Sequence, residues 1–295
     1  MLDSSGGLGH PRLLSIWIPS LMRFDRHLLV RLFGFRGAFL HGDTLVADRW
    51  RFLRRHLPLT RNGETLLDVG CGSGLFTIGA AKRGYQATGL SWDERNQQTA
   101  QTRAQICGVP GTSFPIQDLR DLDRRDDLKE RFDVVLNCEN IEHILNDDKL
   151  MRDIAGCLKP GGRLLFTSPF YYYHALSSAD YGPFSTEEDG GHVRRGYTIG
   201  MLRELCDLSG LMIEEVTTCS GFFSQQVCKV HRLFLGAGWL AIIPLRWMPR
   251  LFDSVLMRFG LRGYSICMVA YKPRFGSSES QVKTANAAQI DVANI

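Results

Sequence analysis

Hydrophobic and polar positions alternate in a regular order from residue 64 onward. Short apolar runs predict buried strands at 65–69, 86–90, 112–116, 132–137, 163–167, 211–217 and 264–271. Longer stretches with helical spacing predict helices at 75–83, 93–107, 147–158 and 198–209. Because strands that alternate with helices form a parallel sheet covered on both faces, the pattern predicts a doubly wound α/β fold.

Three segments lie outside this alternation. Residues 1–58 mix apolar clusters with arginines and predict an N-terminal cap of short helices, and residues 222–262, rich in Phe, Leu, Trp and Arg, predict a helical insertion between the last two strands. The charge-free apolar run 233–245 would rise only about 20 Å as a helix, short of a bilayer core. The polar tail 276–295 is predicted to be disordered.

Charge is unevenly distributed between these segments. Residues 1–60 hold nine basic and four acidic residues, residues 61–221 hold seventeen and twenty-four, and residues 222–275 hold eight and one. The basic, apolar flanks predict peripheral contact with an anionic membrane surface, although they can also be a helical cap or an unevenly charged, solvated surface. Aromatic residues buried in apolar runs argue against a nucleic-acid interface.

Cysteine usage and the N-terminus bear on the compartment. The eight cysteines show no metal-binding spacing, which favours reduced thiols, and no signal-peptide pattern is evident. We therefore expect a cytoplasmic protein, with the basic flanks placing it at the inner face of the membrane.

A glycine-rich turn joins the first predicted strand to the first helix. The stretch 66–74 reads Leu-Leu-Asp-Val-Gly-Cys-Gly-Ser-Gly, and such a turn lets a nucleotide cofactor approach the backbone. A dinucleotide fingerprint would need a glycine where Leu75 stands, and a phosphate loop would need Gly-Lys-Ser/Thr. Both of these cofactor classes are disfavoured.

The pattern Asp68-x-Gly70-x-Gly72-x-Gly74 resembles motif I of the class I S-adenosylmethionine-dependent methyltransferases. The runs 132–135 (Phe-Asp-Val-Val) and 158–162 (Leu-Lys-Pro-Gly-Gly) are similar to further motifs of that family, and the resemblance covers roughly residues 60–220. It implies a Rossmann-like, seven-stranded, mostly parallel sheet whose seventh strand is antiparallel. It also implies a methyltransferase domain over residues 59–275 and S-adenosylmethionine as the cofactor.

The resemblance also implies which residues contact the cofactor. Asp68 would face its ammonium group, and Asp118 would lie beside the adenine; a helix-capping role for the first and a plain loop position for the second are the alternatives. Ser91 stands where most members carry an acid for the ribose, and would bind more weakly. The full implied set is Asp68, Gly70, Cys71, Gly72, Gly74, Ser91, Asp118, Leu119 and Asn137.

The chemistry is expected just after the fourth strand. Glu139, Glu142 and His143 form an E-x-x-E-H run that resembles the ubiquinone-biosynthesis O-methyltransferases, and on a helical turn all three would share one face. By that resemblance His143, with Glu142, is the catalytic pair, His143 acting as general base toward a hydroxyl. A divalent metal held by the carboxylates and a purely structural role remain alternatives, and we assign no metal ligand.

The segment 169–197 is expected to cover the acceptor. Tyr172, His174, His192 and Arg194 are the candidate substrate residues, because they offer aromatic surface and groups that bind a carboxylate or phosphate. The alternative is a loop tied to the fold by salt bridges.

Together these features predict methyl transfer to a small hydrophobic or lipid-linked acceptor, with O-methylation as the favoured reaction. The alternatives are lipid methylenation like that of cyclopropane-fatty-acid synthases, and a non-catalytic, membrane-associated protein with a methyltransferase fold.

Overall fold

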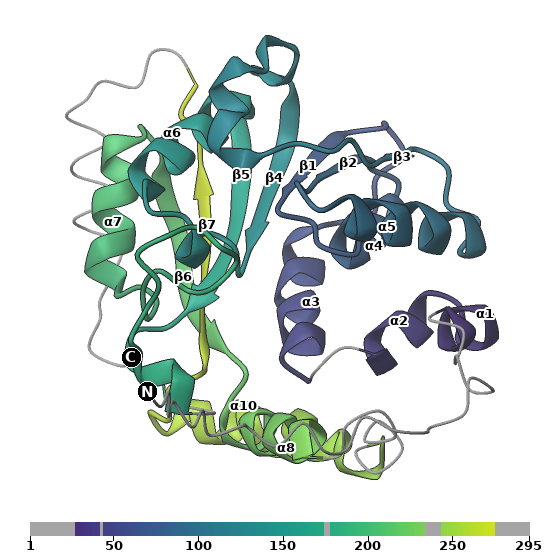
Figure 1. Cartoon of the computed structure of the whole chain (residues 1–295), viewed down its shortest axis with the longest axis vertical. Coiled ribbons are helices and arrows are strands. Elements are labelled where there is room, and N and C mark those ends of the chain that lie inside the picture. The colour runs from purple at the N-terminus through teal and green to yellow at the C-terminus, as the bar shows by residue number, and fades with distance from the viewer. Residues whose placement is uncertain (1–26, 42–43, 174–177, 234–242, 275–295) are drawn as a thin grey trace, which may run out of the picture.

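A computed structural model describes residues 27–41, 44–173, 178–233 and 243–274 of the chain (Figure 1). Its strands are β1 (Thr65–Val69), β2 (Gln86–Leu90), β3 (Thr112–Ser113), β4 (Phe132–Cys138), β5 (Leu158–Pro169), β6 (Met212–Cys219) and β7 (Ser265–Tyr271). Its α-helices are α1 (Leu28–Phe33), α2 (Phe35–His41), α3 (Thr44–His56), α4 (Leu75–Ala81), α5 (Glu94–Ile106), α6 (Asp147–Cys157), α7 (Ile199–Leu208), α8 (Phe222–Leu233) and α10 (Trp247–Arg258). Short 3₁₀ helices occur at Leu119–Arg124, Asp126–Leu128, Ile141–His143, Ser178–Tyr181 and Ile243–Leu245.

The strands form one seven-stranded sheet in the order β3-β2-β1-β4-β5-β7-β6. The first five strands pair in parallel, and β7 runs antiparallel between β5 and β6. The predicted doubly wound, mostly parallel sheet with an antiparallel seventh strand is confirmed. Two strand lengths were wrong: β3 is only two residues long, and β5 begins five residues earlier than predicted, because Leu158 already pairs with Phe132 of β4 before the register shifts.

Residues on successive positions of β1 face opposite layers, because strand side chains alternate between the two faces. Leu67 and Val69 pack in one core with α6, α7 and β7, whereas Leu66 packs in a second core with α3 and α4. Both faces of the central strands are therefore buried, as a parallel sheet requires.

The N-terminal helices pack on the β1–β3 half of the molecule. Phe35 and Phe39 of α2 contact the Trp50 ring of α3 at centroid distances of 5.7 and 6.3 Å, and Trp50 stacks on Phe76 of α4. Gly79 leaves room for this stack, since a Cβ there would lie 2.4 Å from the indole. These contacts explain why α3 lies against the sheet rather than apart from it.

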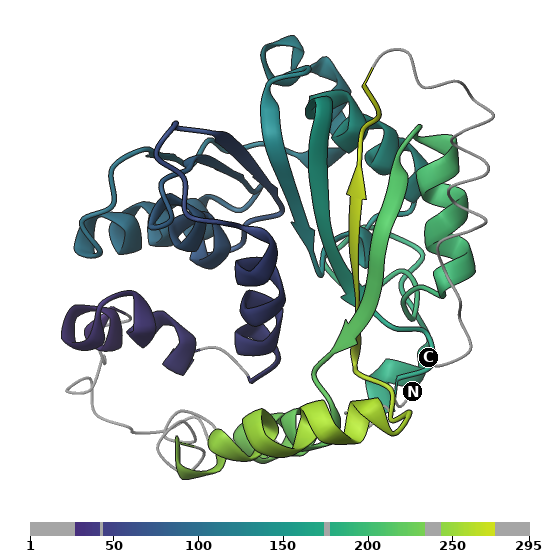
Figure 2. The same ribbon diagram turned by 180° about the vertical axis from the view of Figure 1, so that it is seen from behind.

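Helices α8 and α10 lie together across one end of the sheet (Figures 1 and 2). This end is the one at which β6 ends, and it is also the carboxyl end of β5, because Pro169 pairs with Ser265 at the start of β7. The helical insertion between the last two strands therefore lies on the edge where parallel-sheet proteins bind their ligands.

Some predictions fall partly or wholly outside the described residues. These are residues 1–26 and 42–43 of the N-terminal cap, the candidate substrate residue His174, residues 234–242 of the helical insertion with most of its apolar run, and the tail 276–295. Among the residues that are described, none of the helices has both the length and the apolar content needed to cross a bilayer.

Candidate active site

The glycine turn after β1 has the backbone that its sequence requires. Gly70, Gly72 and Gly74 all have positive φ, at 85°, 49° and 77°, a region that residues with a Cβ rarely adopt. The backbone N–H groups of Gly70 and Cys71 donate to the Leu90 carbonyl at 3.1 and 2.8 Å, which closes the turn against β2.

The three glycines serve two purposes. A Cβ at Gly70 would lie 2.4 Å from the Asn140 amide, and one at Gly74 would lie 2.6 Å from Ala100 of α5. Nothing lies within 4 Å of the position of a Cβ at Gly72. Gly70 and Gly74 therefore permit close packing, and Gly72 leaves the turn open to a ligand that approaches the backbone.

Asp68 is buried beneath this turn. Its Oδ2 accepts a hydrogen bond from the Thr77 hydroxyl of α4 at 2.7 Å, and burial raises the pKa of its carboxyl to about 6. Asp68 is not the helix cap that the alternative interpretation supposed, because Gly74 is the N-cap of α4, but its carboxylate holds this helix through the Thr77 side chain. This hydrogen bond leaves room for the predicted contact with the ammonium, because a carboxylate has further acceptor positions.

Cys71 lies in the turn but is inert. It is buried, and burial raises the pKa of its thiol far above the usual range, with Asp68 adding to the rise. Its sulfur lies 3.4 Å from the Gln97 side-chain oxygen of α5. Its side chain therefore packs the turn, and any contact with the cofactor comes from its backbone.

The end of β2 holds the predicted ribose contact. Ser91 is buried, and its hydroxyl accepts from the Asp93 N–H at 3.3 Å, while Asp93 caps α5. Between them Trp92 is 66% exposed. The sequence analysis missed this indole; the available clue was a large aromatic residue at the carboxyl end of a parallel strand.

The predicted adenine contacts lie at the start of a 3₁₀ helix. Asp118 caps that helix, and its carboxylate receives the Arg120 guanidinium Nε at 2.9 and 3.0 Å. The Arg120 hydrogen bonds hold the pKa of Asp118 below its usual value. Leu119 is buried in the core beside α6.

Two asparagine side chains lie beside the glycine turn, and the side-chain oxygen of each has no hydrogen-bond partner among the described residues. Asn137, at the end of β4, is fully buried and donates to the Val69 carbonyl at 3.1 Å. The Oδ1 atoms of Asn137 and Asn140 are buried without a hydrogen-bond partner within the described residues. A buried polar atom without a partner is costly, so these acceptors, with the open backbone at Gly72, fit a ligand that carries N–H donors. S-adenosylmethionine carries such donors on its amino acid and adenine portions.

The predicted common face for Glu139, Glu142 and His143 is wrong. Only 141–143 form a helical turn, a 3₁₀ turn, and Glu139 precedes it with φ of 51°. Glu139 accepts from the Ser265 hydroxyl at 2.9 Å and lies 3.4 Å from the Arg49 guanidinium of α3. Arg49 was also missed, since nothing local in the sequence relates it to a position ninety residues later.

Glu142 and His143 lie close to a third residue, His192, rather than sharing a helical face with Glu139. Ligand atoms of Glu142, His143 and His192 lie within 4.8 Å of one another, and the two imidazole centroids are 4.6 Å apart. Glu142 is 1% exposed; one of its oxygens accepts from the Ser168 hydroxyl at 3.1 Å, and the other is buried without a partner among the described groups. If a metal binds here, its ligands would be Glu142, His143 and His192, which offer one oxygen and two nitrogen atoms, rather than the two carboxylates of Glu139 and Glu142.

Burial sets the protonation of this cluster. It raises the pKa of the Glu142 carboxyl well above its usual range, and the charge on Glu139 adds to the rise. It lowers the pKa of the His192 imidazole, and His143 lowers it further. His143 Nδ1 lies 2.9 Å from the Gly191 carbonyl. Because a carbonyl only accepts, Nδ1 carries a proton in this contact and Nε2 is left with its lone pair.

The covering segment 169–197 contains both free and committed side chains. Tyr172 is 53% exposed and lies beneath the Arg262 guanidinium. Arg194 binds the Asp147 carboxylate and donates to the Ile144 and Leu145 carbonyls. These contacts favour the salt-bridge alternative for Arg194, because its guanidinium ties this segment to the start of α6.

Comparison with known proteins gives a consistent assignment. A family model described as a methyltransferase domain matches residues 41–216, more than half of the chain. A ubiquinone biosynthesis O-methyltransferase from Marinobacter nauticus is 29% identical over 179 residues, which cover 58% of this chain and 72% of that protein. Another, from Pseudomonas syringae pv. tomato, is 32% identical over 146 residues, covering 48% of this chain and 60% of that protein. The chain thus spans less than two thirds of the second relative.

Among solved structures, phosphoethanolamine N-methyltransferase 2 of Haemonchus contortus, in complex with S-adenosylmethionine, superposes with a TM-score of 0.56. The match covers 84% of this chain and 60% of that one at 20% identity. At this identity the likeness concerns the fold alone, and it agrees with the sheet order described above.

Proposed function

The chain belongs to the family of methyltransferase domains, with S-adenosylmethionine as methyl donor, and on that premise we propose that it methylates an oxygen of a small hydrophobic or lipid-linked acceptor. The observation that carries this proposal is the 2.9 Å contact between His143 Nδ1 and the Gly191 carbonyl. In the neutral imidazole the proton on Nδ1 faces that acceptor, so the lone pair on Nε2 is the base, in the turn that follows β4.

The donor, once bound, supplies a methyl group on a positively charged sulfur that leaves as a neutral thioether. With the donor bound, His143 Nε2 would take the proton of the acceptor hydroxyl and so make its oxygen a better nucleophile toward the methyl carbon. Burial lowers the pKa of the His192 imidazole, which favours its neutral form, so His192 adds no positive charge beside His143. The buried Glu142 also lies close to His143. General-base help of this kind matters because a neutral hydroxyl is a poor nucleophile.

The environment of this base favours an apolar acceptor. Tyr171 and Tyr172 are 42% and 53% exposed on the segment that covers the site, and their rings contact each other at 5.2 Å. The basic helices α8 and α10 lie across the same end of the sheet (Figure 2). Peripheral contact of this end with a membrane would let a lipid-linked acceptor reach His143 without crossing water.

A product analysis tests the proposal. Purified protein is incubated with methyl-labelled S-adenosylmethionine and a lipid extract, and the labelled product is identified by mass spectrometry. We expect a mass gain of one methylene with a new methoxy group and every olefin retained. Loss of an olefin would instead identify lipid methylenation, and absence of cofactor binding by calorimetry would leave only a non-catalytic protein.

A further inference from the structure

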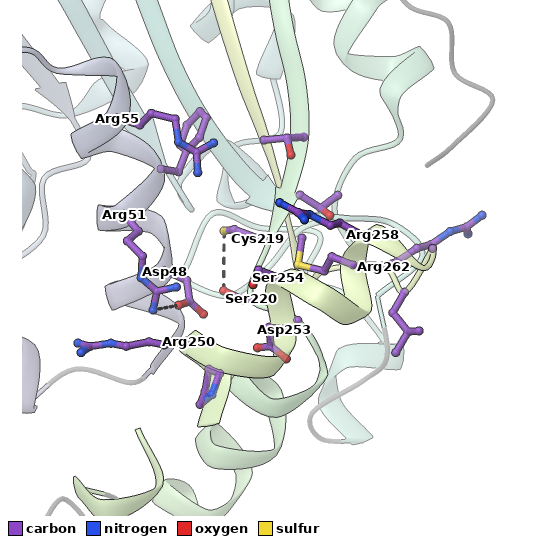
Figure 3. A pocket seen from close by; sticks show the side chains of 18 residues that line it. Asp48, Arg51, Arg55, Cys219, Ser220, Arg250, Asp253, Ser254, Arg258 and Arg262 are labelled. Atoms are coloured by element: carbon purple, nitrogen blue, oxygen red, sulfur yellow. Dashed lines mark hydrogen bonds and ion pairs between the residues drawn. The ribbon is translucent and has the colours of Figure 1, made fainter. Parts of the chain in front are cut away.

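A second cavity lies away from the glycine turn, between α3, the end of β6 and α10 (Figure 3). Its volume is about 440 Å³, enough for a small ligand or headgroup. Arg51 and Arg55 come from the α3 side, and Arg250, Arg258 and Arg262 come from α10 and the turn after it (Figure 3). Five arginines around one cavity indicate an anionic ligand.

Among the described residues, the two carboxylates of this cavity offset the charge of only one of the five arginines, Arg51. Asp253 accepts from the backbone N–H groups of Phe223 and Ser224, at 2.8 and 2.9 Å, and so caps the start of α8. Asp48 accepts from the Ser224 hydroxyl and pairs with Arg51 at 2.8 Å. Both acids are buried and committed to the structure.

The other arginines keep their charge available. Within the described part of the chain, Arg55, Arg250 and Arg258 form no ion pair, and all three are exposed. Hydroxyl groups of Thr217 and Ser254 line the same cavity. Guanidinium and hydroxyl donors without a carboxylate partner are the groups that bind a phosphate.

Helix α10, which lines the cavity, and the turn after it also carry exposed apolar side chains, and one of these, Leu261, lines the cavity itself. Large side chains of α10 and the turn after it project into solvent, namely Trp247, Leu251, Phe252, Val255, Phe259 and Leu261, which are 41–80% exposed. An exposed apolar patch next to a cationic cavity matches the two parts of a phospholipid, with its phosphate in the cavity and its chains against the patch.

We infer that this cavity binds the phosphate group of an anionic phospholipid and so seats the carboxyl end of the sheet on a membrane. The inference rests on the proposed function for the lipid-linked acceptor that makes such seating useful. The geometry also connects the two sites, because Arg262 lines the cavity while its guanidinium lies 5.1 Å from the Tyr172 ring of the segment that covers His143.

Vesicle co-sedimentation of the full chain tests this inference independently of methyl transfer. Vesicles of phosphatidylglycerol are compared with vesicles of phosphatidylcholine, for the wild type and for the double variant Arg55→Gln/Arg258→Gln. We expect wild type to prefer the anionic vesicles, and the double variant to bind them about 30-fold more weakly, because each basic residue near an anionic surface contributes about fivefold. Circular dichroism checks that the variant is folded.

The matched control is Arg54→Gln/Arg61→Gln, which removes the same charge from exposed positions that do not line the cavity. A change of less than threefold in this control supports a defined site. An equal loss in both double variants would overturn the site in favour of general attraction. Calorimetric binding of soluble glycerol phosphate without any binding to vesicles would overturn the lipid source, and failure to bind either would overturn the phosphate ligand. None of these results depends on whether methyl transfer is observed.

Discussion

The two halves of the active-site edge are built in different ways. The donor half, from β1 to α5, is made of one continuous stretch in which three glycines, Asp68 and Ser91 are placed by local backbone geometry. The acceptor half joins segments that are far apart in the chain, such as Arg49 with Glu139 and His143 with His192. The cofactor is the same throughout the family, so its binding site can be set by one local stretch of sequence. The acceptor differs between family members, so its site is formed by segments that come together only in the folded chain.

The largest expected effect is a fall in kcat when a residue of the acceptor half is changed, with little change in the affinity for the cofactor. His143→Gln removes the base but keeps a donor to the Gly191 carbonyl, so kcat should fall about 10²–10⁴-fold. Affinity for S-adenosylmethionine, measured by calorimetry, should change little because the glycine turn is untouched. If kcat of this variant were unchanged, His143 would not be the general base and its role would be structural. His192→Gln, which alters the neighbouring imidazole, is the matched comparison.

The next effect probes the donor half. Asp68→Asn should weaken cofactor binding by about 10–100-fold, because a charge-assisted hydrogen bond to the ammonium is lost. Calorimetry with S-adenosylmethionine measures this loss. Thr77→Val, which removes the hydroxyl partner but keeps the carboxylate, serves as the control and should retain most of the affinity. Equal binding by wild type and Asp68→Asn would show that the acid only anchors α4.

The same substitution should stabilise the protein without cofactor. Burial raises the pKa of Asp68 to about 6, so the folded state holds this proton more tightly than the unfolded state. Stability therefore rises as pH falls from about 6 toward 4, and the penalty of the buried charge is complete above pH 6. Urea unfolding should show Asp68→Asn more stable than wild type by about 1–3 kcal/mol at pH 8, with the difference vanishing near pH 4. A difference that does not vary with pH would contradict this account.

The smallest effect concerns the residue that sequence analysis missed in the donor half. If the exposed Trp92 stacks on the adenine, Trp92→Ala should raise the Kd for S-adenosylmethionine about tenfold, and Trp92→Phe should restore most of it. Equilibrium dialysis with the labelled cofactor measures both. An unchanged Kd for Trp92→Ala would assign the adenine contact to the residues around Asp118 alone.

Much of the fold was predictable because it depends on short-range patterns. The apolar runs and the glycine turn predicted all seven strands and the order of helices between them, and the resemblance of 68–74 to a known motif predicted the cofactor. The errors occurred at strand ends. The prediction placed 158–162 in a turn, yet β5 already begins at Leu158, which pairs with Phe132 of β4, a contact set by a neighbouring strand rather than by local preference.

The active site shows where sequence ceases to be sufficient. Residues 66–74 carry their own geometry, because positive φ at glycine and the strand-to-helix turn are local properties that a sequence states directly. The partners of Glu139, His143 and Arg194 come from segments 47 to 126 positions away and exist only once the sheet has formed. Sequence thus determined the cradle and its donor, and tertiary packing decided which side chains face the acceptor, because packing alone brings distant residues within hydrogen-bonding distance.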